Sequence, residues 1–167
     1  MANWLDFQKI RDWDYLFFQG FQYDAISDEL ISAALADTAN LTQVRPDIDW
    51  QCDSWLAANK TIPSEHKHAY RVASLVNAFR SGDLLTSGIS LDTFNVRQCL
   101  SCVSDGHHRV RALQYLGITA GPFWLSGHVE PLKALIRLAG TTPPENALRY
   151  CTAELLAPHP DDIRLDR

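Results

Sequence analysis

The stretch Val103–Gly117, which reads V-S-D-G-H-H-R-V-R-A-L-Q-Y-L-G, decides the fold that the sequence predicts. The short β-prone run 99–104 leads directly into Asp105 and Gly106, a pair of residues typical of turns. Apolar residues then recur at helical spacing until a glycine, which often follows the last residue of a helix. We therefore expect a strand, a tight turn and a helix over about 108–116.

The turn of this predicted unit combines residues suited to binding an anion. Gly106 can adopt a positive φ or let a ligand approach the backbone closely. The amides that follow it lie at the start of a helix, where the macrodipole favours phosphate. Arg109 adds a guanidinium that can bind phosphate oxygens bidentately, while His107 and His108 can donate hydrogen bonds or move protons. Asp105 can hold a metal ion or orient a histidine.

The run D-G-H-H-R-V-R-A-L-Q-Y-L-G resembles the box that identifies the ParB/sulfiredoxin superfamily. It is similar to the glycine-cysteine-histidine-arginine turn of sulfiredoxin and to the aspartate-glycine-histidine turn of ParB-like free-serine kinases. The resemblance covers about 62–130 and implies that Gly106, His108 and Arg109 bind nucleotide phosphate, with ATP or CTP as the nucleotide and Mg²⁺ as the metal. Asp105 would hold that metal, and Asp105 and His107 are the leading catalytic residues.

Two departures from the family pattern, and one role that must be filled by another residue, limit what the resemblance implies. His107 stands where sulfiredoxin has its cysteine, so we do not expect sulfinic-acid reduction. The chain also lacks the helix-turn-helix region and dimerisation tail of chromosome-partitioning ParB. The kinase-like relatives need an acidic base, and Glu65, near the start of the preceding helix, is one candidate for it; His68 and Arg71 on that helix are further residues that would border the cleft.

Zinc binding is an alternative for the cysteines and histidines near the turn. Cys99 and Cys102 have a spacing that zinc ligands use, and His107 and His108 follow them. The chain has no second paired knuckle, and residues three apart on a strand point to opposite faces. We therefore expect reduced thiols without zinc.

Around the turn, patterning predicts the remaining elements of an α+β domain. A helix should begin after Ser27, a second should cover 64–80, strands should form at 88–94 and 122–126, and helices should follow at 130–138 and 144–156. The predicted fold is a ParB/sulfiredoxin-like small mixed sheet with flanking helices. We expect residues 1–60 to be a helical N-terminal extension packed on the core, 61–157 to be the ParB/sulfiredoxin-like domain, and 158–167 to be a frayed tail.

Composition restricts the classes of function. The 167-residue chain is 46% hydrophobic and carries a net charge of −5, which disfavours strong non-specific binding to duplex DNA. It shows neither a secretory signal nor an apolar run long enough to span a membrane, so we expect a cytoplasmic protein that has no membrane partner.

Three functions from different classes remain. The first, which we prefer, is a nucleotide-dependent enzyme that hydrolyses a nucleoside triphosphate, transfers its phosphoryl group or cleaves nucleic acid. The second is a non-catalytic interaction or inhibitor module of a mobile element, gated by nucleotide and bound to a protein partner. The third is a DNA-partitioning factor, against which the net charge and the missing helix-turn-helix count.

Overall fold

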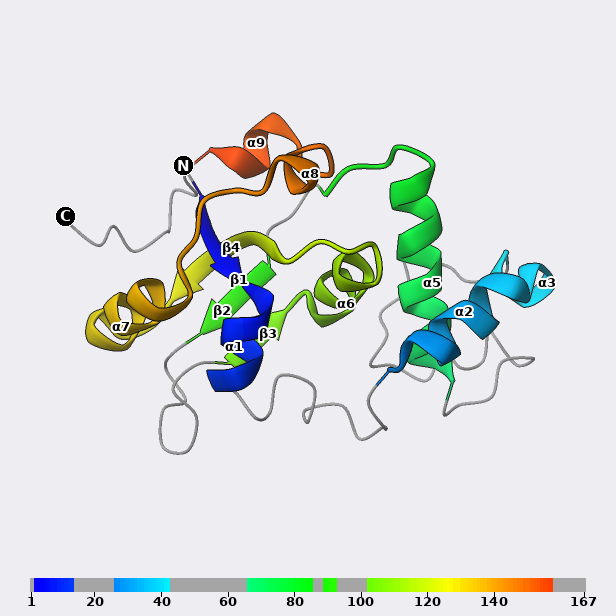
Figure 1. Cartoon of the computed structure of the whole chain (residues 1–167), viewed down its shortest axis with the longest axis horizontal. Helices are drawn as coiled ribbons and strands as arrows, with labels where there is room; N and C mark the ends of the chain where they lie inside the picture. The colour runs from blue at the N-terminus through cyan, green and yellow to red at the C-terminus, as the bar shows by residue number, and fades with distance from the viewer. Residues whose placement is uncertain (1, 14–25, 43–65, 86–88, 93–101, 158–167) are drawn as a thin grey trace.

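A four-stranded mixed sheet and a set of flanking helices make up the computed structural model, which describes residues 2–13, 26–42, 66–85, 89–92 and 102–157 (Figure 1). The elements are, in chain order, β1 (Asn3–Asp6), α1 (Phe7–Trp13), α2 (Asp28–Ala36), α3 (Thr38–Leu41), α5 (Lys67–Arg80), β2 (Ile89–Asp92), β3 (Cys102–Asp105), α6 (His107–Tyr115), β4 (Ala120–Ser126), α7 (Val129–Ala139), α8 (Glu145–Leu148) and α9 (Ala153–Leu156). This confirms the α+β class with a small mixed sheet.

The sheet has the strand order β1-β4-β2-β3. β2 runs parallel to β4, and the other two neighbouring pairs are antiparallel. Ile89 and Leu91 of β2 are fully buried while the residues between and after them are only partly buried, as the predicted alternation requires. Because Asp105 pairs with Ser90, the turn after β3 lies beside the first residues of β2.

The helices on one side of the molecule form successive layers. α6 packs against β2, α5 packs against α6, and α2 packs against α5 (Figure 1). Val110 and Leu113 of α6 and Val72 and Val76 of α5 are buried in the hydrophobic core. α5 therefore lies beside α6, which separates it from β2.

Several predicted helices are confirmed together with the residues that begin or end them. Ser27 caps α2, and its Oγ accepts a hydrogen bond from the amide of Leu30 at 3.3 Å. α5 lies inside the predicted range 64–80, and α7 ends at Gly140 as expected. The helix after the turn starts at His107, one residue earlier than expected, because Gly106 is its N-cap.

The N-terminal segment differs from its prediction. We expected residues 1–60 to be helical, but Asn3–Asp6 form the strand β1, which pairs with β4 from Asn3 opposite Phe123 to Asp6 opposite Ala120. The strand is stabilised by this long-range pairing, which four residues of local pattern do not reveal. The rest of the described extension is helical, and the predicted boundary at 60–61 and the tail 158–167 lie outside the described residues.

The single helix predicted over 144–156 is also wrong. Two short helices, α8 and α9, are separated by a bridge between Leu85 and Cys151. The Leu85 amide donates to the Tyr150 carbonyl at 2.6 Å, and the Thr152 amide donates to the Leu85 carbonyl at 3.2 Å. These two bonds to Leu85 take the place of hydrogen bonds within a continuous helix. Thr152 then caps α9, because its Oγ1 accepts a hydrogen bond from the Leu155 amide.

A buried tyrosine ties α5 to the junction of α2 and α3. The Tyr70 hydroxyl donates to Asp37 Oδ2 at 2.6 Å, and the Asn40 side chain donates to the same oxygen at 2.7 Å. The Tyr70 hydrogen bond is the main cause that lowers the pKa of the Asp37 carboxyl. The carboxylate is therefore held ionised at the junction between these helices.

We expect Tyr70→Phe to lower the midpoint of thermal unfolding by roughly 3 °C or more, because it removes a hydrogen bond to an ionised acceptor. Tyr115→Phe is the matched control, since the Tyr115 hydroxyl shares an exposed 2.9 Å hydrogen bond with Ser32 Oγ. Calorimetry of both variants measures the difference. Equal midpoints for the two variants would show that the Tyr70 bond adds nothing beyond an exposed one.

Within the described part of the chain, no helix combines the length and the apolar character that crossing a bilayer requires.

Candidate functional site

The turn between β3 and α6 places a glycine at the N-cap of the helix. Gly106 is the N-cap and has a φ of 100° and a ψ of 10°, in the left-handed region that favours glycine. The first bond of the helix runs from the Val110 amide to the Gly106 carbonyl at 2.9 Å. The amides of residues 107–109 therefore point out of the N-terminal end of α6, where the macrodipole is positive.

Gly106 is also required by the packing behind the turn. A Cβ atom added to it would lie 3.1 Å from Cγ2 and 3.2 Å from Cα of Ile89. Ile89 is fully buried in β2, so neither atom can move away easily. The backbone of the turn thus sits directly on the sheet.

Arg109 and Asp105 form an ion pair across the turn. Arg109 Nη2 lies 2.6 Å from Asp105 Oδ2, at the spacing of one helical turn. The Arg109 side chain is 16% exposed and that of Asp105 is 72% exposed. The carboxylate therefore holds the guanidinium at the helix start while remaining open to solvent.

His108 is directed toward α5, where it meets a second histidine. Its Nε2 lies 2.8 Å from Nδ1 of His68, and the two rings stack with their centroids 5.1 Å apart. One proton lies between the two nitrogens, so at least one of them is an acceptor. Burial lowers the pKa of His68 to about 4 and that of His108 to about 3, and both rings are neutral near pH 7.

The first turns of α5 add positive charge next to this histidine pair. Lys67 is buried, and the Nε and Nη1 atoms of Arg71 are buried as well. Lys67 contributes to the lowered pKa of His68, and Arg71 contributes to that of His108. The start of α6 is thus locally basic in a chain whose net charge is −5.

His107, the first residue of α6, is half-buried. Burial lowers its pKa to about 4, although the nearby Asp105 acts in the opposite direction. A neutral imidazole can accept a proton or donate one hydrogen bond, but it adds no positive charge for a phosphate. At this position the ring can therefore donate one hydrogen bond and accept another near pH 7, and it is a weak base.

The structure brings most of the predicted site residues into one turn and leaves others undescribed. Asp105, Gly106, His107 and Arg109 lie together, and His108 lies beside them with its ring engaged by His68. Glu65 and Cys99 lie outside the described residues. Among the described residues, no group of three or more histidine, cysteine, aspartate or glutamate side chains is arranged to hold a metal ion.

The contact between His68 and His108 joins residues 40 positions apart and is the feature of the site that the sequence indicates least. The sequence indicates it only through the expectation that the preceding helix borders the turn.

Comparisons with models of protein families, with curated proteins and with solved structures find no match to this chain.

Proposed function

We propose that this chain is a ParB/sulfiredoxin-like protein that binds the phosphates of a nucleoside triphosphate at the turn Asp105–Arg109 and hydrolyses or transfers the terminal phosphoryl group. The observation that carries the proposal is the left-handed Gly106 N-cap, which starts α6 beside the Arg109 guanidinium and the solvent-exposed Asp105 carboxylate. Backbone amides, a helix dipole and a bidentate cation are the combination that phosphate oxygens favour.

Each residue of the turn has a role in this proposal. Arg109 neutralises phosphate charge, and the amides of residues 107–109 bind phosphate oxygens. His107 is neutral at pH 7 and accepts a hydrogen bond from the attacking group, acting as a weak general base because burial lowers its pKa to about 4. His108 acts as a positioning residue, since its ring is fixed against His68 on α5.

Magnesium fits the turn through a single carboxylate. Mg²⁺ is commonly held by one or two carboxylates together with phosphate oxygens and water, and Asp105 is the exposed carboxylate at this position. When bound, the ion would neutralise charge on the transferring phosphoryl group. Asp105 would have to leave its ion pair with Arg109, which would release the guanidinium toward the phosphate.

We expect Arg109→Ala to weaken the binding of ATP or CTP by about tenfold or more, because it removes a charge-assisted contact worth roughly 1.4 kcal/mol or above. Titration calorimetry with ATP, CTP, GTP and ADP, each with and without Mg²⁺, measures the affinity. Arg137→Ala, which removes an exposed arginine of α7, is the matched control and should bind like the wild type.

Two results of this titration would contradict the proposal. One is nucleotide binding that Arg109→Ala leaves intact, and the other is the absence of saturable binding by any of the four nucleotides. Release of inorganic phosphate from the nucleotide that binds best then separates a hydrolase from a protein that only binds.

A further inference from the structure

The imidazole rings of His68 and His108 form a pair between α5 and α6. Nδ1 of His68 lies 2.8 Å from Nε2 of His108, and the planes of the stacked rings differ by 19°. Each histidine is the second residue of its helix. The pair therefore lies where the starts of the two helices meet, beside the Asp105–Arg109 turn.

The contact between the two rings fixes how many protons the pair can hold. A neutral imidazole carries one N–H, so in the neutral pair one ring donates to the other across the 2.8 Å contact. The accepting ring keeps its own proton on its far nitrogen, whereas the far nitrogen of the donating ring has none. That nitrogen can take up a proton, which turns the contact into a charge-assisted hydrogen bond. A second added proton would set two N–H groups against each other, so the pair has room for one.

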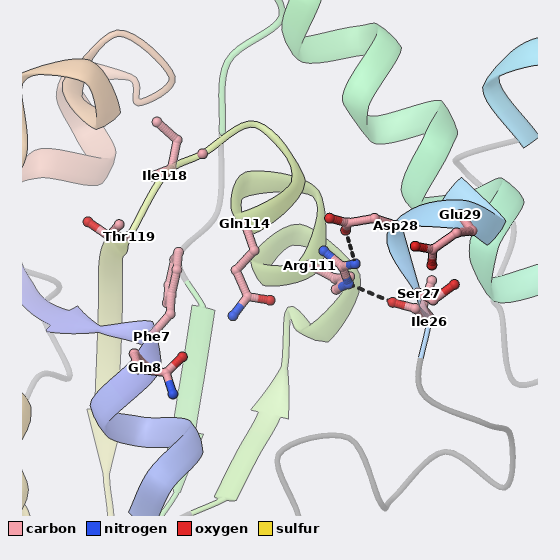
Figure 2. Close-up of a pocket in the computed structure, with 11 residues that line it drawn as sticks. Phe7, Gln8, Ile26, Ser27, Asp28, Glu29, Arg111, Gln114, Ile118 and Thr119 are labelled. Atoms are coloured by element: carbon pink, nitrogen blue, oxygen red, sulfur yellow. Dashed lines mark hydrogen bonds and ion pairs between the residues drawn. The ribbon is translucent and has the colours of Figure 1, made fainter. Parts of the chain in front are cut away.

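The described surroundings of the pair oppose the uptake of that proton. Burial lowers the pKa of both histidines, and basic groups nearby add to this effect; these groups are Lys67, Arg71, His107 and Arg109. Asp105 of β3 is paired with Arg109, and its side chain is 72% exposed. Arg111, the next cation of α6, is directed instead to α2, where it pairs with Asp28 beside a separate pocket of about 640 Å³ (Figure 2).

An anion bound at the start of α6 would change this balance. His108 supplies both one ring of the pair and one amide of the first helical turn, where the macrodipole attracts anions. A dianion held there by Arg109 offsets the repulsion from the nearby cations, and negative charge close to an imidazole favours its protonated form. By linkage, a proton on the pair strengthens the binding of the anion by the same factor.

We propose that the pair of His68 and His108 takes up one proton from the solvent when an anion binds at the Asp105–Arg109 turn, so that phosphate binding becomes stronger as the pH falls. The inference rests on the proposed function, because its anion site is the phosphate site of that proposal, and it adds regulation of that site by pH. The coupling acts through charge over a short distance, so neither ring has to touch the phosphate.

The first test titrates the full chain with sodium sulfate and follows the amide signals of residues 107–110 by NMR, at constant ionic strength and without divalent cations. Sulfate keeps both of its charges between about pH 5.5 and 7.5, whereas a terminal phosphate titrates within this range. A change in affinity therefore reports on the protein. We expect the dissociation constant to fall by about fivefold or more from about pH 7.5 to 5.5, within the limit of about tenfold per pH unit that one proton sets.

A double variant, His68→Asn with His108→Gln, assigns this pH dependence to the pair. Each amide places a hydrogen-bonding atom near the ring nitrogen that makes the contact, but neither amide can be protonated. The ratio of the dissociation constants at the two pH values should fall below about twofold. His66→Asn, a change of the less buried histidine that precedes α5, is the matched control and should keep the ratio of the wild type. A double variant that retains the ratio would overturn the inference.

The ring signals of the wild-type protein give a direct measurement that does not depend on the double variant being folded. Comparison with the single variants His68→Asn and His108→Gln assigns the signals of the two rings. With saturating sulfate, the midpoint at which the pair takes up its proton should rise by about two pH units or more.

The outcomes separate this inference from the proposed function. An affinity for sulfate that is the same at both pH values, or ring signals whose midpoint does not rise with sulfate, would overturn the inference. If nucleotide binding that depends on Arg109 persists in that case, the proposed function stands without regulation by the histidine pair. If neither sulfate nor any nucleotide binds at any pH, both proposals are wrong.

Discussion

Gly106→Ala should lower the free energy of unfolding by about 2–4 kcal/mol, which corresponds to a fall of roughly 5–15 °C in the unfolding midpoint. Two costs combine at this position. An alanine would have to keep a φ of 100°, and its Cβ would lie 3.1–3.2 Å from atoms of the buried Ile89. Urea unfolding and calorimetry measure the loss.

Gly82→Ala is the control that separates these two costs. Gly82 has a φ of 97°, nearly the same as Gly106, but a Cβ added there meets no atom within 4 Å. Its substitution should therefore cost only the conformational part, about 1–2 kcal/mol. If the two variants lose equal stability, the turn does not rest on β2 as tightly as the structure indicates.

The second large effect concerns pH. The pKa of His68 and of His107 is lowered to about 4 and that of His108 to about 3, chiefly by burial, whereas an unfolded histidine titrates near 6.5. Between these values the unfolded chain binds more protons than the folded one. The contribution of these histidines to the free energy of unfolding is therefore fully present above about pH 6.5, and it is lost as the pH is lowered toward 4.

Each of these histidines adds a slope of up to about 1.4 kcal/mol per pH unit inside that window. Protonation of the pair is opposed further by Lys67, Arg71 and Arg109, whose positive charges lie near the two rings. Urea unfolding at several pH values from about 5 to 7 measures the slope above the range where most carboxylates titrate.

His68→Asn should reduce this slope, because it removes one of the groups that bind a proton on unfolding. His66→Asn, a change of a less buried histidine two residues away, is the matched control and should leave most of the slope in place. A wild-type protein whose stability does not change between about pH 7 and 5 would contradict the buried neutral pair.

Local signals in the sequence are sufficient to predict where several helices begin and end. Gly106 and Gly117 delimit α6, Ser27 marks the start of α2, and Gly140 follows α7. In each case the residue that begins or ends the helix lies within a few positions of it, so the pattern contains the information. The turn that carries the candidate site belongs to this class of local features.

The features that the sequence does not predict depend on contacts between distant segments. β1 is a strand because it pairs with β4 more than 110 positions later, and α8 and α9 are separated because Leu85 pairs with Cys151. The pairing of His68 with His108 likewise joins two separate helices, α5 and α6, and a pocket beside Arg111 is lined by residues of α1, α2 and α6. Short windows of sequence carry no information about such partners.

The position of β1 has a consequence for how the chain acquires its structure during synthesis. Asn3–Asp6 have no strand partner until Ala120–Ser126 have been made, and the Trp4 carbonyl accepts its bond from Thr141 only later still. The helical layer of α2, α3 and α5 contains contacts of much shorter range and can assemble while the ribosome is still translating the second half. β1 is therefore synthesised well before its partner and is among the last of the described strands to be incorporated, and a nascent chain stalled before β4 would hold β1 unpaired.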